Sequence, residues 1–445
     1  MMTRPPFISM LINSNDLKRL LGLLIVIFLC SCSGIKIRTS EVGPGWAKNS
    51  VNTVIFRQSA ITSDQQYQFT AYYDNDSYLV LARREVGSSK WKIQKTQYQG
   101  NTKDAHNAIS IALDGEGFLH VSWDHHDSNL KYAVSKQPLS LKLGEMQSMT
   151  GKQESKVSYP QFYNFPDGDL LFMYRSGQSG KGSLVLNHFN NETRKWKQIQ
   201  NNLIDGEGER NAYWQASVDK KNRIHLSWTW RETWDVSTNH DIAYAVSSDK
   251  GKIWKKSSGE TYTLPINQSS AEIAWEIPQK QNLINQTSMT VNDKGLPFIS
   301  SYWEEGDQTQ FQIVYFQDGK WKKEITDFRN STFDLGGGGT KSIPISRPEI
   351  LVTGGIIYLV YRDAERNNRI SLAYKKYGLT TDWKVKNLTS YSVGQWEPNY
   401  DRRVFKSNKE LHLFVQNVKQ EDAEGLSDTE PTMIKIVELT KLPIK

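Results

Sequence analysis

The sequence predicts an all-β protein with the architecture of a seven-bladed β-propeller. Three observations lead to this prediction. A strand–hairpin–strand pattern recurs seven times, one of the repeats contains a complete Asp-box turn, and no segment shows a sustained helical period. The composition agrees with an aromatic-rich β protein, because the chain has 14 Trp, 20 Tyr and 16 Phe at a mean hydropathy of -0.59.

The seven repeats share one plan. A turn with Asp, Asn or Lys and Gly precedes an alternating apolar strand that ends in an aromatic residue, then a polar hairpin, a second strand and usually a closing Trp. The repeats start roughly 50 to 75 residues apart, as expected for four-stranded blades with variable loops. In chain order they are Tyr67–Trp91, Gly117–Ala133, Gly168–Trp196, Arg223–Trp254, Gly295–Trp321, Gly355–Trp383 and Glu410–Leu439.

The fourth repeat carries the Asp box. Ser247, Asp249, Gly251 and Trp254 fit the pattern Ser-x-Asp-x-Gly-x-x-Trp, in which Ser and Asp bind the backbone of a hairpin turn and the Trp packs between strands. This motif indicates the fold and carries no chemistry. The glycine run 336–339 lacks the following Lys-Ser/Thr of a phosphate-binding loop, so we interpret it as a loop of flexibility or close approach.

The first 31 residues are predicted to be a lipoprotein signal peptide. Lys18 and Arg19 precede an apolar run over residues 20–29 that is short for a bilayer-spanning helix, and a Leu-Cys-Ser-Cys segment ending at Cys32 has the form of a lipoprotein cleavage box. Cys32 would then be the lipidated first residue. An ordinary signal peptide or short anchor that happens to contain Cys is the alternative.

After cleavage we expect a tether over residues 32–44 and a single propeller domain over residues 45–445. Cys32 is followed by Ser33 and Gly34, without an Asp at the second position and without an acidic cluster. We therefore expect an outer-membrane lipoprotein that faces the periplasm rather than the outside of the cell. Acyl chains, and not a spanning helix, would hold it at the membrane.

Charge and cysteine content restrict the partners. The formal charge of +7 falls to about +5 after cleavage, an excess that suits an anionic ligand. No dense Lys/Arg block is present, which argues against a nucleic-acid partner. With Cys30 removed and Cys32 acylated, the mature chain would have no disulfide and no thiolate metal site. We expect a monomer.

Two of the eight histidines, His120 and His225, are interpreted as structural, and two more, His188 and His412, as structural or surface residues. His120 and His225 hold equivalent positions in two repeats (Leu-His-Val-Ser-Trp and Ile-His-Leu-Ser-Trp), which is typical of strand residues that the repeat itself encodes. His188 and His412 have no polar neighbours in sequence that suggest a site.

Other histidines are candidates for proton transfer. His106, beside Asn107, precedes an apolar strand and is therefore expected at the rim of the central channel. His125 and His126 follow the end of a strand in the next hairpin. A rim histidine has a pKa near 6.5 and can act as acid or base with little adjustment. Solvated loop histidines are the alternative.

A tyrosine and an arginine complete the candidate set. Tyr159 and Arg175 lie on consecutive strand segments of the third repeat, and Tyr213 holds in the fourth repeat the position that Tyr159 holds in the third. Repeat geometry would therefore bring both phenols to one face. A phenol can protonate a leaving oxygen, and a guanidinium can hold a carboxylate.

The ordered motifs resemble the BNR-4 repeat family and, within it, the propeller-type ulvan lyases, which cleave a sulfated polysaccharide of rhamnose and uronic acid by β-elimination. The resemblance runs from Gly45-Trp46 to the last repeat. It rests on His106, Trp123-Asp-His-His126, Tyr159-Pro-Gln-Phe, Tyr174-Arg175-Ser-Gly, Asn211-Ala-Tyr213, Trp228-Thr-Trp-Arg231 and Asn239-His240-Asp241.

The resemblance implies a role for each matched residue. His106 corresponds to the catalytic histidine, His126 to a second active-site histidine, Tyr159 to the catalytic tyrosine, Arg175 to the residue that neutralises the uronate, and Tyr213 to a substrate contact. Substrate contacts are also expected at Asn107, His125 and Arg231, and the adjacent His125 leaves the second histidine ambiguous by one position. The implied chemistry needs no cofactor, whereas His240 is a candidate position for a structural Ca or Zn ion.

Alternative functions remain open at this point. A related chain could act as a lyase or a glycoside hydrolase on the rhamnose–glucuronate bond of another polysaccharide, but a hydrolase normally needs two carboxylates facing one bond and no such pair stands out. A sialidase would need three arginines around a carboxylate. A non-catalytic glycan-binding lipoprotein would explain the aromatic residues but not the grouping of His106, Tyr159 and Arg175.

Overall fold

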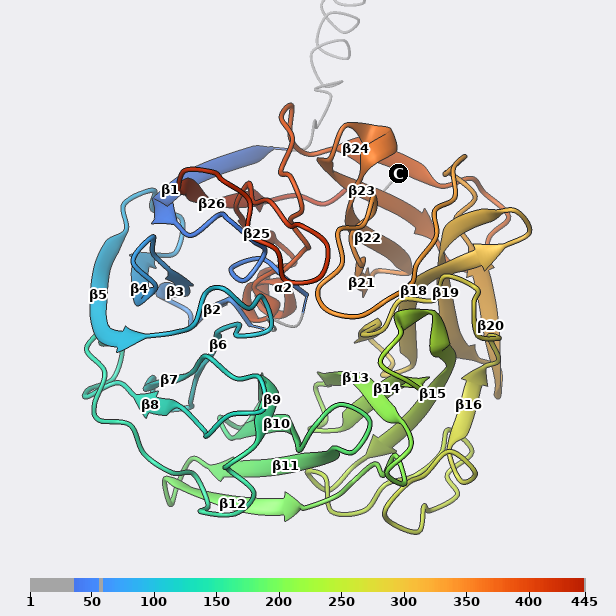
Figure 1. The fold of residues 1–445 in the computed structure, drawn as a ribbon, viewed down its shortest axis with the longest axis horizontal. Helices are drawn as coiled ribbons and strands as arrows, with labels where there is room; N and C mark the ends of the chain where they lie inside the picture. The colour runs from blue at the N-terminus through green and yellow to red at the C-terminus, as the bar shows by residue number, and fades with distance from the viewer. Residues whose placement is uncertain (1–35, 56–58, 444–445) are drawn as a thin grey trace, which may run out of the picture. The chain divides into compact units, whose positions relative to one another are not determined.

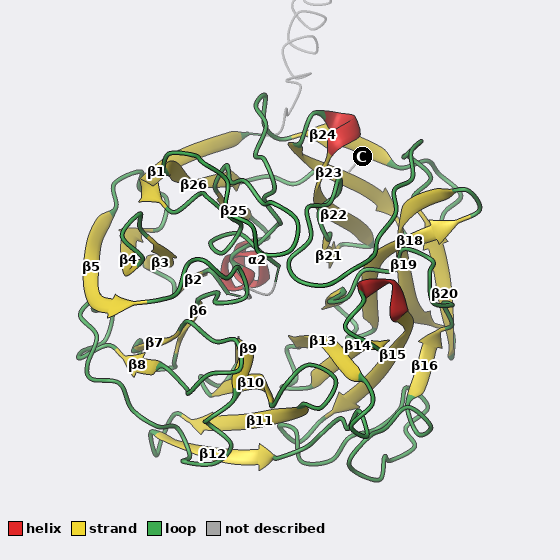
Figure 2. Cartoon of the chain, in the orientation of Figure 1, coloured by secondary structure: helices red, strands yellow, loops and turns green. Residues whose placement is uncertain are grey.

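Seven antiparallel sheets surround a common central axis (Figure 1). The computed structural model describes residues 36–55 and 59–443 of the chain. Five sheets have four strands and two have three, and apart from one short helix and two 3-10 turns the described chain consists of strands and loops (Figure 2). This confirms the predicted all-β, seven-bladed propeller.

The first three blades lie in the order of the chain. The first contains β2 (Ile61–Ser63), β3 (Tyr67–Tyr73), β4 (Tyr78–Glu85) and β5 (Lys92–Gln99); the second contains β6 (Ser110–Leu113), β7 (Leu119–Ser122) and β8 (Tyr132–Val134); the third contains β9 (Val157–Asn164), β10 (Leu170–Ser176), β11 (Ser183–Asn190) and β12 (Lys195–Gln200).

The next three blades repeat this order. The fourth contains β13 (Asn211–Val218), β14 (Ile224–Arg231), β15 (Asn239–Ser247) and β16 (Glu272–Trp275); the fifth contains β17 (Ser288–Val291), β18 (Pro297–Glu305), β19 (Gln308–Gln317) and β20 (Lys320–Ile325); the sixth contains β21 (Glu349–Thr353), β22 (Ile356–Asp363), β23 (Arg369–Lys376) and β24 (Lys384–Asn387). Two 3-10 turns, η1 (Val236–Thr238) and η2 (Ala364–Arg366), lie in loops.

The last blade joins both ends of the propeller. β25 (Leu411–Val415) pairs with β26 (Thr432–Leu439), and β26 pairs with β1 (Ile37–Gly45) from Ile37 opposite Leu439 to Gly45 opposite Thr432. The propeller therefore begins at Ile37. The predicted boundary at residue 45 is wrong, because residues 37–44 of the expected tether form most of an outer blade strand.

The core consists of apolar side chains packed between neighbouring sheets. Trp254 of the Asp box is fully buried, and its indole Nε1 donates to the Gly251 carbonyl at 2.9 Å. Ser247 Oγ accepts from Gly251 N at 2.9 Å, and Asp249 Oδ1 accepts from Ile253 N at 2.9 Å. The predicted turn chemistry is thus confirmed. Large buried aromatic side chains supply much of the apolar burial that stabilises such a fold.

Two buried histidines show how the repeat encodes structure. His120 Nδ1 lies 2.7 Å from the Tyr132 hydroxyl and its Nε2 lies 3.2 Å from Asp114; His225 makes the corresponding contacts with Tyr244 at 2.8 Å and Asp219 at 3.5 Å. Burial lowers the pKa of both histidines. The prediction that they are structural is confirmed.

The predicted signal peptide and the lipidation site Cys32 lie outside the described residues, so those assignments and the membrane location stay predictions. Within the described chain, no helix combines the length and the apolar character that crossing a bilayer requires. A short helix, α2 (Arg402–Asn408), lies near the central axis in Figure 1.

Strand β1 should be needed for stability. A protein lacking residues 1–45 is expected to unfold at lower urea concentration than one lacking residues 1–35, because the truncation exposes the β26 edge and removes the buried Val42. Burial of one such side chain alone contributes roughly 1.5–3 kcal/mol, so we expect a loss of at least about 2 kcal/mol. Equal unfolding midpoints would show that β1 does not close the ring.

Candidate active site

Strand direction brings the candidate residues to one face of the propeller. Because neighbouring strands are antiparallel, the innermost strand of a blade starts where the second strand ends. Tyr159 and Tyr213 lie near the starts of the innermost strands β9 and β13, and Arg175 and Arg231 lie near the ends of the second strands β10 and β14. All four residues therefore share this face, as the repeat pattern predicted for the two phenols.

The two histidines reach the same face from loops. His106 lies in the loop between β5 and β6, and His126 lies in the loop between β7 and β8. Their rings stack with centroids 4.2 Å apart and an interplanar angle of 19°. The Tyr159 ring centroid lies 5.9 Å from that of His106 and 6.4 Å from that of His126. The structure thus joins both histidines and the tyrosine in one cluster.

One carboxylate orients both histidines. Asp104 Oδ1 lies 2.8 Å from His106 Nδ1, and Asp104 Oδ2 lies 2.6 Å from His126 Nδ1. A second carboxylate, Glu424 Oε1, lies 3.1 Å from His106 Nδ1. A carboxylate at Nδ1 fixes the tautomer and the orientation of an imidazole and leaves Nε2 to face outward.

These carboxylates decide the charge of His106. Burial alone would lower the pKa of His106, but the hydrogen bonds and charges of Asp104 and Glu424 outweigh it and raise the pKa to about 9. Burial raises the pKa of Asp104 and Glu424, yet the adjacent histidines hold both below the ordinary range. His106 is therefore an imidazolium at neutral pH.

Tyr159 lies at the centre of the cluster in a strained backbone conformation. Its φ is 57°, in the left-handed region that a bulky aromatic residue seldom occupies, and the register between β9 and β10 shifts opposite it. Such strain persists where surrounding contacts impose it and is frequent at functional sites. Burial raises the pKa of the Tyr159 phenol, so it stays protonated across the ordinary pH range.

Two guanidinium groups, those of Arg175 and Arg231, lie beside the phenols. The Arg175 guanidinium lies 4.9 Å from the Tyr159 ring centroid, and Arg231 Nη1 lies 3.5 Å from the Tyr213 hydroxyl. Their remaining contacts are to Ser158, Gly177, Thr233 and Trp234. Within residues 36–55 and 59–443, neither arginine forms an ion pair. Burial raises the pKa of Tyr213, but Arg231 and Arg175 reverse this and lower it.

Two predicted substrate contacts, His125 and Asn107, are not presented to a ligand. His125 is fully buried, its Nε2 accepts from Lys131 N at 2.7 Å, and burial lowers its pKa to about 3. The geometry therefore favours His126 over His125. Asn107 is buried next to His106, and its amide donates to the Asn101 carbonyl at 2.9 Å to hold the loop.

His240 lies between two carboxylates. Its Nε2 is 2.8 Å from Glu232 Oε1 and its Nδ1 is 2.9 Å from Asp241 Oδ2, so both ring nitrogens are occupied. Glu232 also accepts from Arg210 Nε at 3.0 Å. This network accounts for His240 without an ion, and a metal at this position stays a prediction.

In the part of the chain that the structure describes, the ligand atoms close enough to share a cation belong to Asp104, His106 and His126, all within 4.8 Å of one another.

Asp104 and Glu424 were not identified from the sequence. The sequence contains a local indication of the role of Asp104, because an Asp two residues before a histidine can bind that histidine. It contains none for Glu424, since this residue lies in the loop between β25 and β26 and reaches His106 only when the ring closes.

The glycine run 336–339 supports the Glu424 loop. Thr340 N donates to Glu424 Oε1 at 2.7 Å, Ala423 N donates to the Thr340 carbonyl at 2.9 Å, and Ala105 N donates to Glu424 Oε2 at 3.0 Å. Gly339 has a φ of 72°, and a Cβ there would lie 2.9 Å from Ala423 Cα. The prediction that this glycine run allows another part of the backbone to approach closely is confirmed.

Replacing Glu424 by Gln should lower the pKa of His106. The change removes one of the two charges that oppose burial, and the single amide oxygen of Gln can still accept from either the Thr340 or the Ala105 amide. We expect a proton NMR titration of His106 to move to lower pH. Glu421→Gln, a charge change in the same loop that does not contact His106, should leave the titration in place. An unchanged midpoint in Glu424→Gln would contradict the assigned contact.

Comparisons with known proteins agree with this fold. A model of the BNR repeat-containing family matches residues 67–328, more than half of the chain. A search of curated sequences finds no match. The structure of the polysaccharide lyase Uly1 matches at a TM-score of 0.67 and 17% identity over 91% of this chain and 99% of that one.

Two structures of a PL25 ulvan lyase are also similar. One has a TM-score of 0.63 and 15% identity over 90% of this chain and 92% of that one. The other, bound to -[GlcA(1-4)Rha3S]-, has a TM-score of 0.65 and 15% identity over 88% of this chain and 94% of that one. At these identities the likeness establishes the fold. The chain therefore belongs to the BNR repeat-containing family and shares the seven-bladed propeller fold of the polysaccharide lyases that it resembles.

Proposed function

We propose that this protein is an ulvan lyase that cleaves the bond between rhamnose, sulfated or not, and glucuronate by β-elimination. The observation that carries the proposal is the pair of guanidiniums of Arg175 and Arg231, which form no ion pair among the described residues and lie next to two phenols and a stacked histidine pair on one face. An anionic sugar would supply the missing counter-charge. Similarity to structures described as polysaccharide and ulvan lyases supports the same reading.

The first requirement of the reaction is to acidify the proton on carbon 5 of the uronate. Removing it places a second negative charge beside the carboxylate. Arg175 and Arg231 would hold that carboxylate and stabilise the enolate-like transition state. His106, as an imidazolium, would add positive charge to the same region.

His126 is our candidate for the base. Its Nδ1 faces Asp104 at 2.6 Å, and its side chain is 36% exposed, so Nε2 can meet a substrate. The base takes the proton from carbon 5, the electron pair forms the C4=C5 double bond, and the bond from C4 to the leaving oxygen breaks. Tyr159 donates its phenolic proton to that oxygen. Proton transfer through solvent then returns His126 and Tyr159 to their starting states.

A glycan-binding surface extends beyond this cluster. Trp234 is 69% exposed and follows Arg231 in the loop before η1, where its carbonyl accepts from Arg231 Nη2. An exposed indole beside a cationic site can stack on a sugar ring. We assign Trp234 to a neighbouring sugar of the polymer.

A hydrolase is the second candidate, because Asp104 and Glu424 form a carboxylate pair that the sequence did not reveal. A glycosidase acid needs a carboxyl whose pKa is raised so that it carries a proton. Both carboxyls here have lowered pKa values and bind His106. Their environment thus favours elimination over hydrolysis.

Digestion of ulvan by the purified protein should produce a 4,5-unsaturated uronate at each new non-reducing end. The conjugated double bond gives ultraviolet absorbance that rises in proportion to the new reducing ends. Reducing ends that appear without absorbance would favour the hydrolase, and binding without either signal would favour a glycan-binding protein.

Substitutions within the cluster should remove activity and keep the fold. His126→Ala, His106→Ala and Tyr159→Phe should each reduce kcat by about 10²- to 10⁴-fold, because each removes a positioned proton-transfer or charged group. Arg175→Lys should lose most activity, since an ammonium cannot bind a carboxylate in bidentate form. His125→Gln is the matched control outside the cluster. Activity within a few-fold of wild type in both His126→Ala and Tyr159→Phe, with circular dichroism unchanged, would reject these roles.

A further inference from the structure

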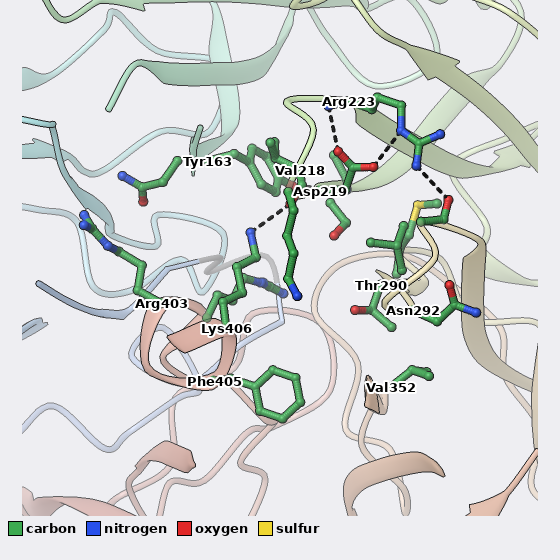
Figure 3. Close-up of a pocket in the computed structure, with 18 of the residues that line it drawn as sticks. Tyr163, Val218, Asp219, Arg223, Thr290, Asn292, Val352, Arg403, Phe405 and Lys406 are labelled. Atoms are coloured by element: carbon green, nitrogen blue, oxygen red, sulfur yellow. Dashed lines mark hydrogen bonds and ion pairs between the residues drawn. The ribbon is translucent and has the colours of Figure 1, made fainter. Parts of the chain in front are cut away.

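A second cationic cavity lies at the opposite end of the central channel. The cavity encloses about 280 Å³. Its lining residues come from the ends of the innermost strands β9 and β13, from the turn after β17 and from α2 (Figure 3). The candidate active site lies where β9 and β13 begin. The two sites are therefore on opposite faces.

The lining carries far more positive than negative charge. Its eight cationic residues are Lys220, Lys221, Arg223, Lys294, Arg402, Arg403, Lys406 and Lys409, whereas its two acidic residues are Asp219 and Asp293. Asp219 is already neutralised by Arg223 at 2.6 Å, and Asp293 lies 3.6 Å from Lys220. Arg402 pairs with Glu349 at 3.1 Å.

The three remaining cations of this group on or next to α2 donate to backbone carbonyls. Arg403 donates to the Leu113 carbonyl at 3.2 Å, Lys406 Nζ to the Val218 carbonyl at 2.8 Å, and Lys409 Nζ to the Lys406 carbonyl at 3.4 Å. Among the residues with described positions, none of the three forms an ion pair. Figure 3 shows the Lys406 side chain extending from α2 toward Val218.

The cationic side chains repel one another at this site. Burial, followed by repulsion from Arg402, lowers the pKa of Lys406 to about 8; Asp219 opposes this shift, and Arg403 and Lys409 add to it. Burial is also the first cause that lowers the pKa of Arg403 and of Lys409. A concave site lined by charge of one sign and by low-dielectric walls concentrates its field on a ligand of opposite sign.

We propose that this cavity is a binding site for an oxyanion group, a sulfate or a carboxylate, with Lys406 as its central contact. Apolar side chains such as Phe405 and Val352 also line the cavity and would suit the ring of an attached sugar. The group can arrive as free inorganic sulfate or on an acidic saccharide. Only the saccharide source rests on the proposed function, because anion binding here requires no lyase activity.

Calorimetric titration of the full chain tests this proposal. Sodium sulfate and sodium glucuronate are titrated at constant ionic strength set by chloride, with glucose as the neutral control. We expect saturable binding of at least one anion, no binding of glucose, and affinity reduced at least ten-fold in Lys406→Met. Lys92→Met, an exposed lysine on the outer strand β5, should bind like wild type.

Two further variants keep the result interpretable. Lys409→Met should also weaken binding, and it replaces Lys406→Met if that variant does not fold. Arg231→Ala removes half of the guanidinium pair on the other face, and the Lys406-dependent binding should persist in it. Sulfate binding alone would assign the cavity to the free ion, and glucuronate binding would assign it to acidic sugars. Binding that is absent, shared by glucose, or unaffected by both lysine variants would overturn the proposal.

Discussion

The alternation of strand direction within each blade is the constraint on which the candidate site depends. It brings the start of every innermost strand and the end of every second strand to one face, so Tyr159, Tyr213, Arg175 and Arg231 meet although they come from four strands. It also places the turns after the innermost strands on the other face, where they line a separate cationic cavity. The fold thus positions the two sites for which we propose anionic ligands at opposite ends of one channel.

Ring closure adds a second constraint. The outer strand of the last blade comes from the start of the described chain, and the loop between β25 and β26 places Glu424 against His106. His106 is therefore oriented by Asp104 from its own loop and by Glu424 from the far end of the sequence. The same two carboxylates keep its imidazole charged up to about pH 9, which suits the charge-stabilising role that we propose for His106 beside His126 as the proposed base.

Periodicity and motifs predicted the architecture because each of the first six repeats corresponds to the second and third strands of a blade, with its own turn and aromatic residues. Repeat position predicted that Tyr159 and Tyr213 share one face, whereas local motifs and the family resemblance predicted the other members of the cluster, His106, His126 and Arg175. They could not reveal contacts between distant loops. Glu424 and the burial of His125 depend on how the loops cross the face, and the pairing of β1 with β26 depends on closure of the ring.

The central claim is that Arg175 and Arg231 hold the uronate carboxylate while His126 and Tyr159 flank the bond that breaks. A crystal structure of the Tyr159→Phe protein with a glucuronate–rhamnose oligosaccharide tests it most directly. We predict the carboxylate between both guanidiniums, carbon 5 facing His126 Nε2 and the leaving oxygen next to the ring of residue 159. An oligosaccharide whose carboxylate contacts neither arginine would contradict the account.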